Sequence, residues 1–235
     1  MFTRSFFILS LTFHACLSGS EVNRCELIER RLLDAPQPSV VIQELEHAGL
    51  LKTMMPELAA LVGVPQHKPW HPEGDAYLHT LQVLDAAARR TYETERDKLI
   101  FLYTALCHDL GKAITTALDE KGIWRAHKHE EIVVPLARTM LERLGVEESI
   151  IVVVCKLSRH HMDPTQFIRH KEPDETYHWL SKELDGVVTL QRLMAFTLCD
   201  LQGRGADGPL TKEDFPELEA FKVRAREVGI LNTEG

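Results

Sequence analysis

Paired cysteines, excess positive charge and long apolar runs are all missing from this sequence, and each absence excludes a class of protein. The five cysteines form an odd set with no C-x-x-C pair, so neither a disulfide framework nor a zinc knuckle is expected. Cys107, Cys155 and Cys199 lie in apolar runs, which indicates reduced core residues and a cytoplasmic protein. The net charge of −8 argues against a protein that coats nucleic acid, because that affinity comes mostly from Lys and Arg.

An apolar run from Ser5 to Phe13 is too short to span a bilayer, which takes about 20 apolar residues. Arg4 precedes it and small residues follow at 18–20, an outline typical of a secretory signal peptide. His14 and the reduced-looking cysteines speak against that interpretation, and an N-terminal extension or an upstream start codon explains the same residues. We therefore expect no membrane association, and a periplasmic or secreted protein only if residues 1–20 are a signal peptide.

The rest of the chain has the composition and periodicity of a helical protein. Its 235 residues, 44% of them apolar, are enough to bury one substantial core, and no repeat, low-complexity tract or long linker divides them. Beyond residue 20, apolar residues recur every three or four positions, and alternating stretches are hard to find. The pattern predicts an all-α helical bundle, with a single domain over 21–235 and its core over about 40–208.

Caps, glycines and prolines set the expected helix boundaries. Ser39 is expected to cap the second helix, Thr211 to cap the last, and Pro164 to end the helix that begins at Glu147. Residues 63–75, with three prolines, two histidines and two glycines, must form a loop, and 113–125 are expected to be irregular. The expected helices span 21–33, 39–49, 57–62, 76–91, 96–109, 129–144, 147–160, 174–184, 186–201 and 211–228.

Ionisable residues inside apolar helical runs are the feature that calls for a function. The pair His108-Asp109 ends an apolar run, and Asp200 is the only charged residue between 193 and 201. A buried carboxylate without a partner is strongly unfavourable, and a divalent cation shared by both carboxylates would remove that penalty. With His79, two imidazoles and two carboxylates make a mixed nitrogen and oxygen site that suits a first-row metal or magnesium. Because such carboxylates would repel one another, Asp200→Asn is predicted to stabilise the metal-free protein or leave it unchanged.

Each residue also has a simpler structural explanation. A lone histidine such as His79 is more often a hydrogen-bonded core residue than a ligand, and Asp200 alone could simply pair with Arg204. The adjacent His108-Asp109, followed by Leu-Gly-Lys, is much harder to explain in this way.

In its order, the set His79, His108-Asp109 and Asp200 resembles the HD-domain metal-dependent phosphohydrolases. The resemblance is closer to the HD domain of bacterial CCA-adding tRNA nucleotidyltransferases and covers about 40–208. It rests on Val64-Pro65, Trp70-His71-Pro72-Glu73, His79-Thr80, the stretch from Leu106 to Lys112, His129 and the stretch from Asp200 to Arg204. A nucleotidyltransferase head also needs a Gly-Ser followed by paired aspartates, but Gly19-Ser20 is followed by Glu-Val-Asn. We therefore expect a free-standing HD domain without tRNA tail synthesis.

The resemblance implies a metal-dependent phosphohydrolase with 2′,3′-cyclic phosphodiesterase, 2′-nucleotidase and phosphatase activities. His79, His108, Asp109 and Asp200 would hold a divalent ion (Mn, Ni, Mg, Co, Fe or Zn), and His108 and Asp109 are the predicted catalytic residues. The ion would activate a water for attack on phosphorus. The expected substrate is a small phosphorylated molecule, a nucleotide or an RNA end, and the oligomeric state is not predicted.

Four further side chains are predicted to contact substrate phosphate: Lys112, His129, His161 and Arg204. Lys112 follows His108 by about one helical turn, and Arg204 could act as a bidentate clamp, although either could be a solvated charge. Some relatives bind a second metal through extra histidines, so a binuclear site is the lesser alternative for His129 and His161, and histidines without a role are another.

Two other functions stay open. One is a different HD enzyme, either a nucleotidase that acts on other nucleotides or a cyclic-dinucleotide phosphodiesterase, although the Gly-Tyr-Pro element usual in the latter does not appear. The other is a non-catalytic module, derived from a tRNA nucleotidyltransferase, that binds RNA or a partner. Four intact ligand positions count against the latter, since a pure scaffold gains little from buried carboxylates.

Overall fold

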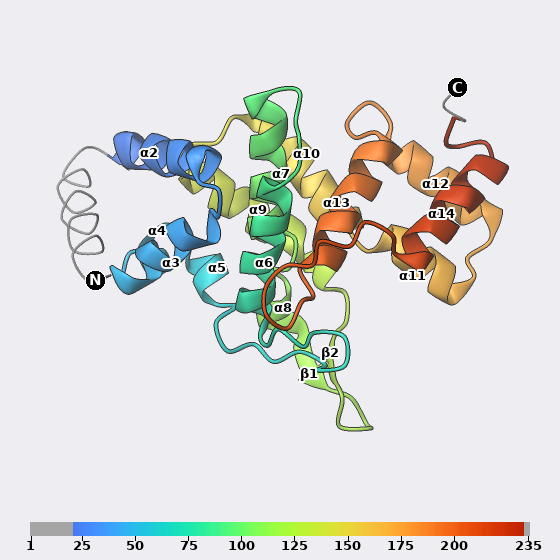
Figure 1. Cartoon of the computed structure of the whole chain (residues 1–235), viewed down its shortest axis with the longest axis horizontal. Coiled ribbons are helices and arrows are strands. Elements are labelled where there is room, and N and C mark those ends of the chain that lie inside the picture. The colour runs from blue at the N-terminus through green and yellow to red at the C-terminus, as the bar shows by residue number, and fades with distance from the viewer. Residues whose placement is uncertain (1–20, 233–235) are drawn as a thin grey trace.

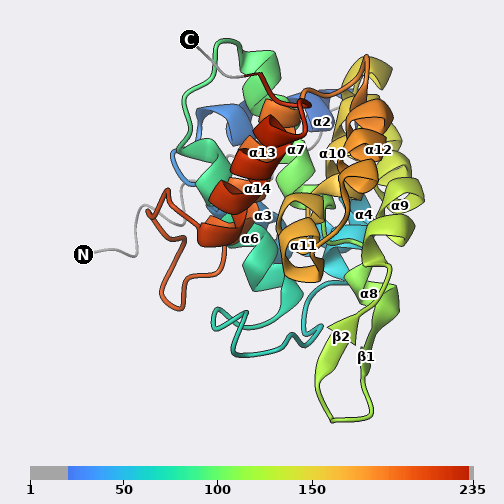
Figure 2. The same cartoon turned by 90° about the vertical axis from the view of Figure 1, so that its right-hand side faces the viewer.

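The computed structural model describes residues 21–232, which are mostly helical (Figures 1 and 2). The prediction of a helical protein is confirmed, and the alternatives for residues 1–20 lie outside the described residues. The helices are α2 (Glu21–Asp34), α3 (Ser39–His47), α4 (Leu51–Met54), α5 (Pro56–Ala59), α6 (Ala76–Ala88), α7 (Glu95–Cys107), α8 (Lys112–Thr115), α9 (His129–Arg143), α10 (Glu148–His160), α11 (Asp163–His170), α12 (Asp174–Leu184), α13 (Leu190–Gln202) and α14 (Pro216–Glu227). Two strands, β1 (Thr116–Leu118) and β2 (Trp124–Ala126), pair antiparallel. Among the described helices, none is long and apolar enough to cross a bilayer.

Helix α7 lies at the centre of the molecule. All nine residues from Leu99 to Cys107 are buried, and a helix that is apolar on every face must be surrounded by other elements. It packs against α6 and α10, and also touches α2, α9 and α13. Its buried C-terminal end delivers His108 and Asp109 to the interior.

The other helices form two end groups and a middle group around this centre. Figure 1 shows α2 to α5 at the N-terminal end of the long axis and α11, α12 and α14 at the opposite end. Helices α6, α9, α10 and α13 lie between them, where α9 packs on α10 and α13 packs on α6. The hairpin β1–β2 projects from this body, and both views show it standing clear of the helices.

The hairpin corrects the expectation of an irregular linker over 113–125. Thr116 pairs with Ala126, and the turn between the strands is built by Asp119 and Gly122. The Asp119 carboxylate accepts hydrogen bonds from the backbone N–H groups of Lys121 and Ile123, and Gly122 adopts a φ of 72°. This is the turn chemistry that Asp and Gly favour, so the signal was present in the sequence but too short to interpret.

Three expected boundaries are also wrong. Ser39 is the first residue of α3 and not its cap, because its hydroxyl donates instead to Asp85 Oδ2 at 2.6 Å. Pro164 lies in the first turn of α11, where a missing N–H is tolerated, so it starts an unexpected helix. Thr211 caps nothing, and the last helix begins at Pro216.

Candidate metal centre

The four predicted ligands converge in the interior from three helices. His79 lies on α6, His108 and Asp109 follow α7, and Asp200 lies on α13; all four are buried. His79 Nε2 is 2.9 Å from Asp200 Oδ1 and 3.8 Å from Asp109 Oδ2. His108 Nε2 is 3.2 Å from Asp109 Oδ2 and 3.9 Å from Asp200 Oδ1. The fold therefore joins residues that lie 121 positions apart in the chain.

Two glycines allow the helix ends to approach closely enough for this convergence. A Cβ on Gly203 would lie 2.3 Å from Val83 Cγ2, so only glycine lets the end of α13 meet α6 beside His79. A Cβ on Gly111 would lie 2.2 Å from the backbone oxygen of His129, where α9 begins. Glycine at this turn thus lets the start of α9 approach Asp109, and His129 Nε2 lies 3.2 Å from Asp109 Oδ1.

Backbone carbonyls orient three of the histidines. Nδ1 of His108, His129 and His161 lies 2.8 Å from the carbonyl oxygens of Ala105, Ala126 and Ser158, respectively. A hydrogen bond donated from Nδ1 leaves the lone pair on Nε2 free, and this is the arrangement in which histidines bind metals. His161 Nε2 lies 3.8 Å from Asp109 Oδ1, so all three Nε2 atoms face the same carboxylate.

Several polar atoms of the cluster are buried without a hydrogen-bond partner. They are His108 Nε2, His129 Nε2 and Asp109 Oδ1, whereas Asp109 Oδ2 forms an ion pair with Lys112. Unsatisfied buried polar atoms are rare, and these three lie close together. Two groups of three side chains, His79 with His108 and Asp200, and His108 with Asp109 and His161, each bring ligand atoms within 4.8 Å of one another. Imidazole and carboxylate donors in this arrangement fit a divalent transition metal.

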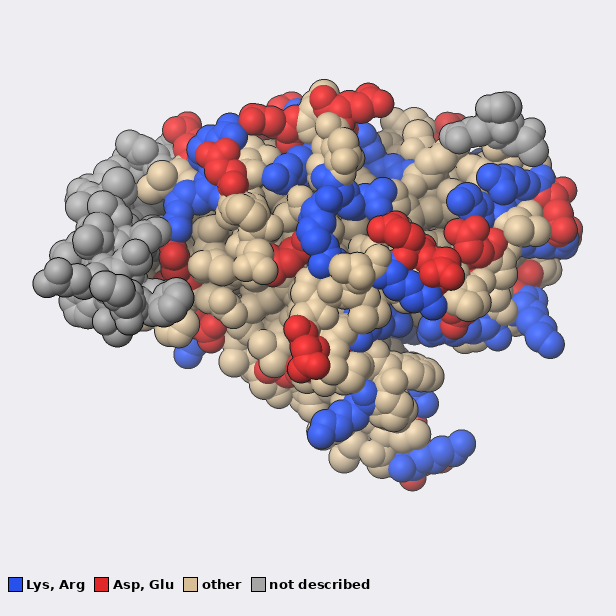
Figure 3. Space-filling view, in the orientation of Figure 1, with Lys and Arg blue, Asp and Glu red and all other residues tan. Residues whose placement is uncertain are grey.

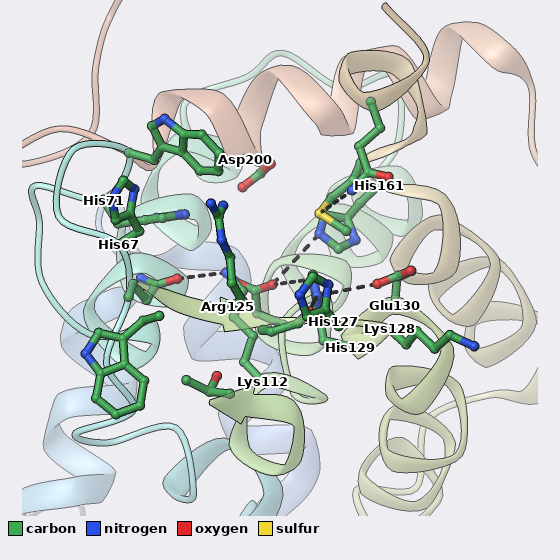
Figure 4. A pocket seen from close by; sticks show the side chains of 18 of the residues that line it. His67, His71, Lys112, Arg125, His127, Lys128, His129, Glu130, His161 and Asp200 are labelled. Carbon is green, nitrogen blue, oxygen red and sulfur yellow. Dashed lines mark hydrogen bonds and ion pairs between the residues drawn. The ribbon is translucent and has the colours of Figure 1, made fainter. Parts of the chain in front are cut away.

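A pocket of about 440 Å³ opens onto the cluster. Six of the eight predicted site residues line it, and Figure 4 shows Asp200 on one wall, His67 and His71 to one side and His161 to the other. The remaining two, His79 and His108, lie fully buried behind the aspartates. Neither predicted cation is a free solvated charge: Lys112 Nζ lies 2.6 Å from Asp109 Oδ2, and Arg204 donates to Asp200 Oδ2 at 2.8 Å.

The family model for the HD domain matches residues 76–196 of this chain. The chain belongs to the HD-domain family. The match begins at the helix that carries His79, and the resemblance noted from the sequence is confirmed.

This HD domain is related to the HD region of curated multifunctional CCA proteins. It is 34% identical to the one from Pasteurella multocida (86% of this chain, 47% of the relative) and 32% identical to the one from Xanthomonas campestris pv. campestris (88% and 50%). The multifunctional CCA protein of Pseudomonas fluorescens is 32% identical over 86% of this chain and 48% of its own length. The chain spans about half the length of the curated relatives it matches.

Opposite charges compensate one another among the buried histidines and aspartates of this site. Burial raises the pKa of Asp109, but the charges of His108 and Lys112 outweigh it and hold this pKa well below its ordinary value. Burial also raises the pKa of Asp200, but the charge of Arg204 and the hydrogen bond from His79 hold this pKa well below its ordinary value. His79 responds in the opposite sense: burial lowers its pKa, but hydrogen bonds to Asp200 and Glu73 raise it overall. Burial lowers the pKa of His161 to about 3, so this imidazole is neutral.

Glu73 is a site residue that sequence reasoning did not identify. Its Oε1 lies 2.8 Å from His79 Nδ1 and 2.7 Å from His71 Nδ1, and its side chain is completely buried. Burial raises the pKa of Glu73, but the hydrogen bonds from His71 and His79 lower it to about 2. The available signal was the stretch Trp70-His71-Pro72-Glu73, which carries part of the family resemblance, but no spacing rule says which residue of this loop folds back onto His79. His160, by contrast, pairs with Asp163.

Proposed function

We propose that this HD domain is a metal-dependent phosphohydrolase that opens 2′,3′-cyclic phosphodiesters and hydrolyses 2′-phosphates. The observation that carries the proposal is the convergence of His108, Asp109 and His129 at the base of a pocket, where Nε2 of both histidines is buried without a hydrogen-bond partner and Lys112 and Arg204 pair with the two aspartates. Membership of the HD-domain family supports phosphohydrolase activity, and the relation to multifunctional CCA proteins supports a nucleotide or an RNA end as substrate.

In this proposal His79, His108, Asp109 and Asp200 hold the ion. A divalent cation there would polarise a phosphoryl oxygen and lower the pKa of a coordinated water. Glu73 positions His79, because a carboxylate on Nδ1 orients the ring and makes Nε2 a better donor of its lone pair. The Ala105 carbonyl does the same for His108.

The protein's own side chains then share the remaining tasks. Asp109, ionised at neutral pH and almost inaccessible to solvent, would accept the proton of the water that attacks phosphorus, while the phosphorus–oxygen bond to one ribose oxygen breaks and that oxygen takes up a proton. Lys112 and Arg204 neutralise charge on the phosphate oxygens from their places beside the two aspartates. The burial of Asp109 and Asp200 keeps bulk water away, which strengthens these charge interactions.

His129 and His161 suit a different task from the phosphate contacts first expected. With Nδ1 committed to a backbone carbonyl, the neutral ring of His161 offers only a lone pair at Nε2 and cannot donate to a phosphate oxygen, and Nδ1 of His129 is committed in the same way. This orientation supports the alternative in which both rings bind a second cation beside Asp109.

The test combines metal retention with hydrolysis. Protein stripped with chelator and reloaded with Mn²⁺, Ni²⁺ or Mg²⁺ should open 2′,3′-cyclic AMP and hydrolyse 2′-AMP faster than 3′-AMP. His108→Ala and Asp109→Ala should lose at least about tenfold in bound metal with little change in helical circular dichroism. His47→Ala is the matched control, since His47 is an exposed residue on α3.

Each contrary result points to a specific alternative. Equal metal content in wild type and both variants would remove the assigned ligands. Activity on deoxynucleoside monophosphates alone would favour the nucleotidase, and metal retention without any hydrolysis would favour a non-catalytic module.

A further inference from the structure

An exposed tryptophan lies at the mouth of the pocket beside two arginines. Trp70 is 50% exposed, although a large apolar side chain on a loop is not needed for the core. The guanidinium carbon of Arg125 lies 5.2 Å from the centre of the indole ring, and that of Arg169 lies 5.7 Å from it. The three residues come from the 63–75 loop, β2 and α11, so tertiary structure alone assembles the group. Two cation–π contacts hold the indole in place while half of its surface stays open to solvent.

The lining of the pocket contains five Lys and Arg side chains against three carboxylates, those of Asp109, Glu130 and Asp200. Lys112 and Arg204 already serve the interior beside the aspartates, whereas Arg125, Lys128 and Arg169 line the outer part. Figure 3 shows acidic and basic side chains interspersed over the body and Lys and Arg side chains on the projecting lobe. In a protein of net charge −8, a local excess of cations around a pocket marks where an anion is attracted.

The outer cations have acidic neighbours, but these pairs are exchangeable. Arg125 Nε lies 3.3 Å from Asp119, Arg169 Nη2 lies 3.6 Å from Glu217, and Lys128 Nζ lies 3.9 Å from Glu131. Ion pairs at such distances on partly exposed side chains contribute little stability. Phosphate oxygens could replace these carboxylates at small cost.

We infer that Trp70, Arg125 and Arg169 form a docking rim for single-stranded RNA, in which a base stacks on Trp70 and the arginines bind backbone phosphate. The inference rests on the proposed function. A 2′,3′-cyclic phosphate lies on the last ribose of an RNA strand, so a strand whose end reaches the aspartates must leave through the mouth. Exposure orders the residues along this path, from Asp109 at 1% and Asp200 at 4% to Trp70 at 50%.

An aromatic face flanked by guanidinium groups matches the chemistry of single-stranded RNA. Unstacked bases are bound on aromatic rings and on arginine planes, and the backbone is followed by positive charge. The phosphate of a mononucleotide would contact only Lys112 and Arg204. The outer cations Arg125, Lys128 and Arg169 therefore indicate a substrate with at least one additional phosphate. The rim therefore specifies an oligonucleotide end in preference to a free nucleotide.

The test uses two substrates and one binding assay. The substrates are 2′,3′-cyclic AMP and a 5′-fluorescein tetraadenylate that ends in a 2′,3′-cyclic phosphate, each assayed for kcat/KM with Mn²⁺. The same tetraadenylate is titrated by fluorescence anisotropy in chelator, at low and high salt. The variants are Trp70→Ala, Trp70→Phe and Arg169→Gln, with Trp179→Ala and Arg226→Gln as controls, since both controls replace residues that lie outside the pocket lining.

We expect Trp70→Ala to weaken binding of the tetraadenylate about tenfold, and to lower the ratio of its kcat/KM to that of 2′,3′-cyclic AMP by a similar factor. Trp70→Phe should recover most of the loss because it keeps a stacking face, and Arg169→Gln should reduce the salt dependence of binding. Equal affinities of Trp70→Ala and Trp179→Ala for the tetraadenylate, or no binding of the tetraadenylate by wild type, would overturn the proposal that this rim docks RNA. If wild type hydrolyses neither substrate, the proposed function fails, and the anisotropy measurements still decide whether the rim binds RNA.

Discussion

The substitution Asp200→Asn removes one negative charge from the proposed metal centre and preserves the size of the side chain. In the metal-free protein Asp200 accepts hydrogen bonds from His79 Nε2 at 2.9 Å and from Arg204 Nη2 at 2.8 Å. Hydrogen bonds to a charged group contribute about 1.5–3 kcal/mol each, and relief of repulsion from Asp109 offsets part of their loss. We therefore expect Asp200→Asn to destabilise the metal-free protein by about 2 kcal/mol, which is about 4–8 °C in Tm for a chain of this size. The sequence alone predicts a neutral or stabilising effect, because it offers the pair with Arg204 only as an alternative and does not show the hydrogen bond from His79.

The effect of metal on the same variant separates a ligand from a structural partner. An ion at about 100 times its Kd stabilises the wild-type fold by about 2.7 kcal/mol, or about 5–11 °C in Tm. A variant that has lost one ligand binds the ion more weakly, so we expect Mn²⁺ to raise its Tm by less than about half as much.

The assay is a set of melting curves for three proteins, each with chelator and with Mn²⁺. The third protein, Asp85→Asn, has the same chemical change on α6, where Asp85 accepts two hydrogen bonds from Ser39 outside the cluster. It should melt lower than wild type but show the full increment from Mn²⁺. If Mn²⁺ raises all three Tm values equally, Asp200 is not a ligand and its role is to pair with Arg204.

Two further predictions address packing and protonation. Gly111→Ala should destabilise the protein by about 1–3 kcal/mol and lower its metal content, because the new Cβ would lie 2.2 Å from the His129 backbone oxygen; unchanged urea unfolding and metal content would contradict this. Burial lowers the pKa of His161 to about 3, so between about pH 6.5 and 3 the unfolded chain binds the extra proton and stability falls as the pH falls. His161→Gln in chelator should therefore lose stability less steeply than wild type from pH 7 to 5, by up to about 1.4 kcal/mol per pH unit, and equal slopes in urea unfolding at pH 7, 6 and 5 would refute the assignment.

The sequence by itself determined the helical class and the chemical types at the centre. The run from Leu99 to Cys107 is apolar on every face, so it had to form a buried element, and the ionisable pair at its end had to enter the interior with it. Asp200 in its apolar run carries the same information. These features are local, because one continuous segment of the chain contains both the periodicity and the residue types.

Contacts between segments were decided only by the tertiary structure. Glu73 folds back onto His79, and the carbonyl of Ala126 turns the Nε2 atom of His129 toward Asp109. Neither contact follows from a repeat or a spacing, because each depends on how a loop packs against a helix from another part of the chain. Trp70 likewise meets Arg125 and Arg169 only once three distant segments have packed together. The sequence thus carries the donors of the site, whereas packing sets their orientation, their partners and the path by which a substrate would reach them.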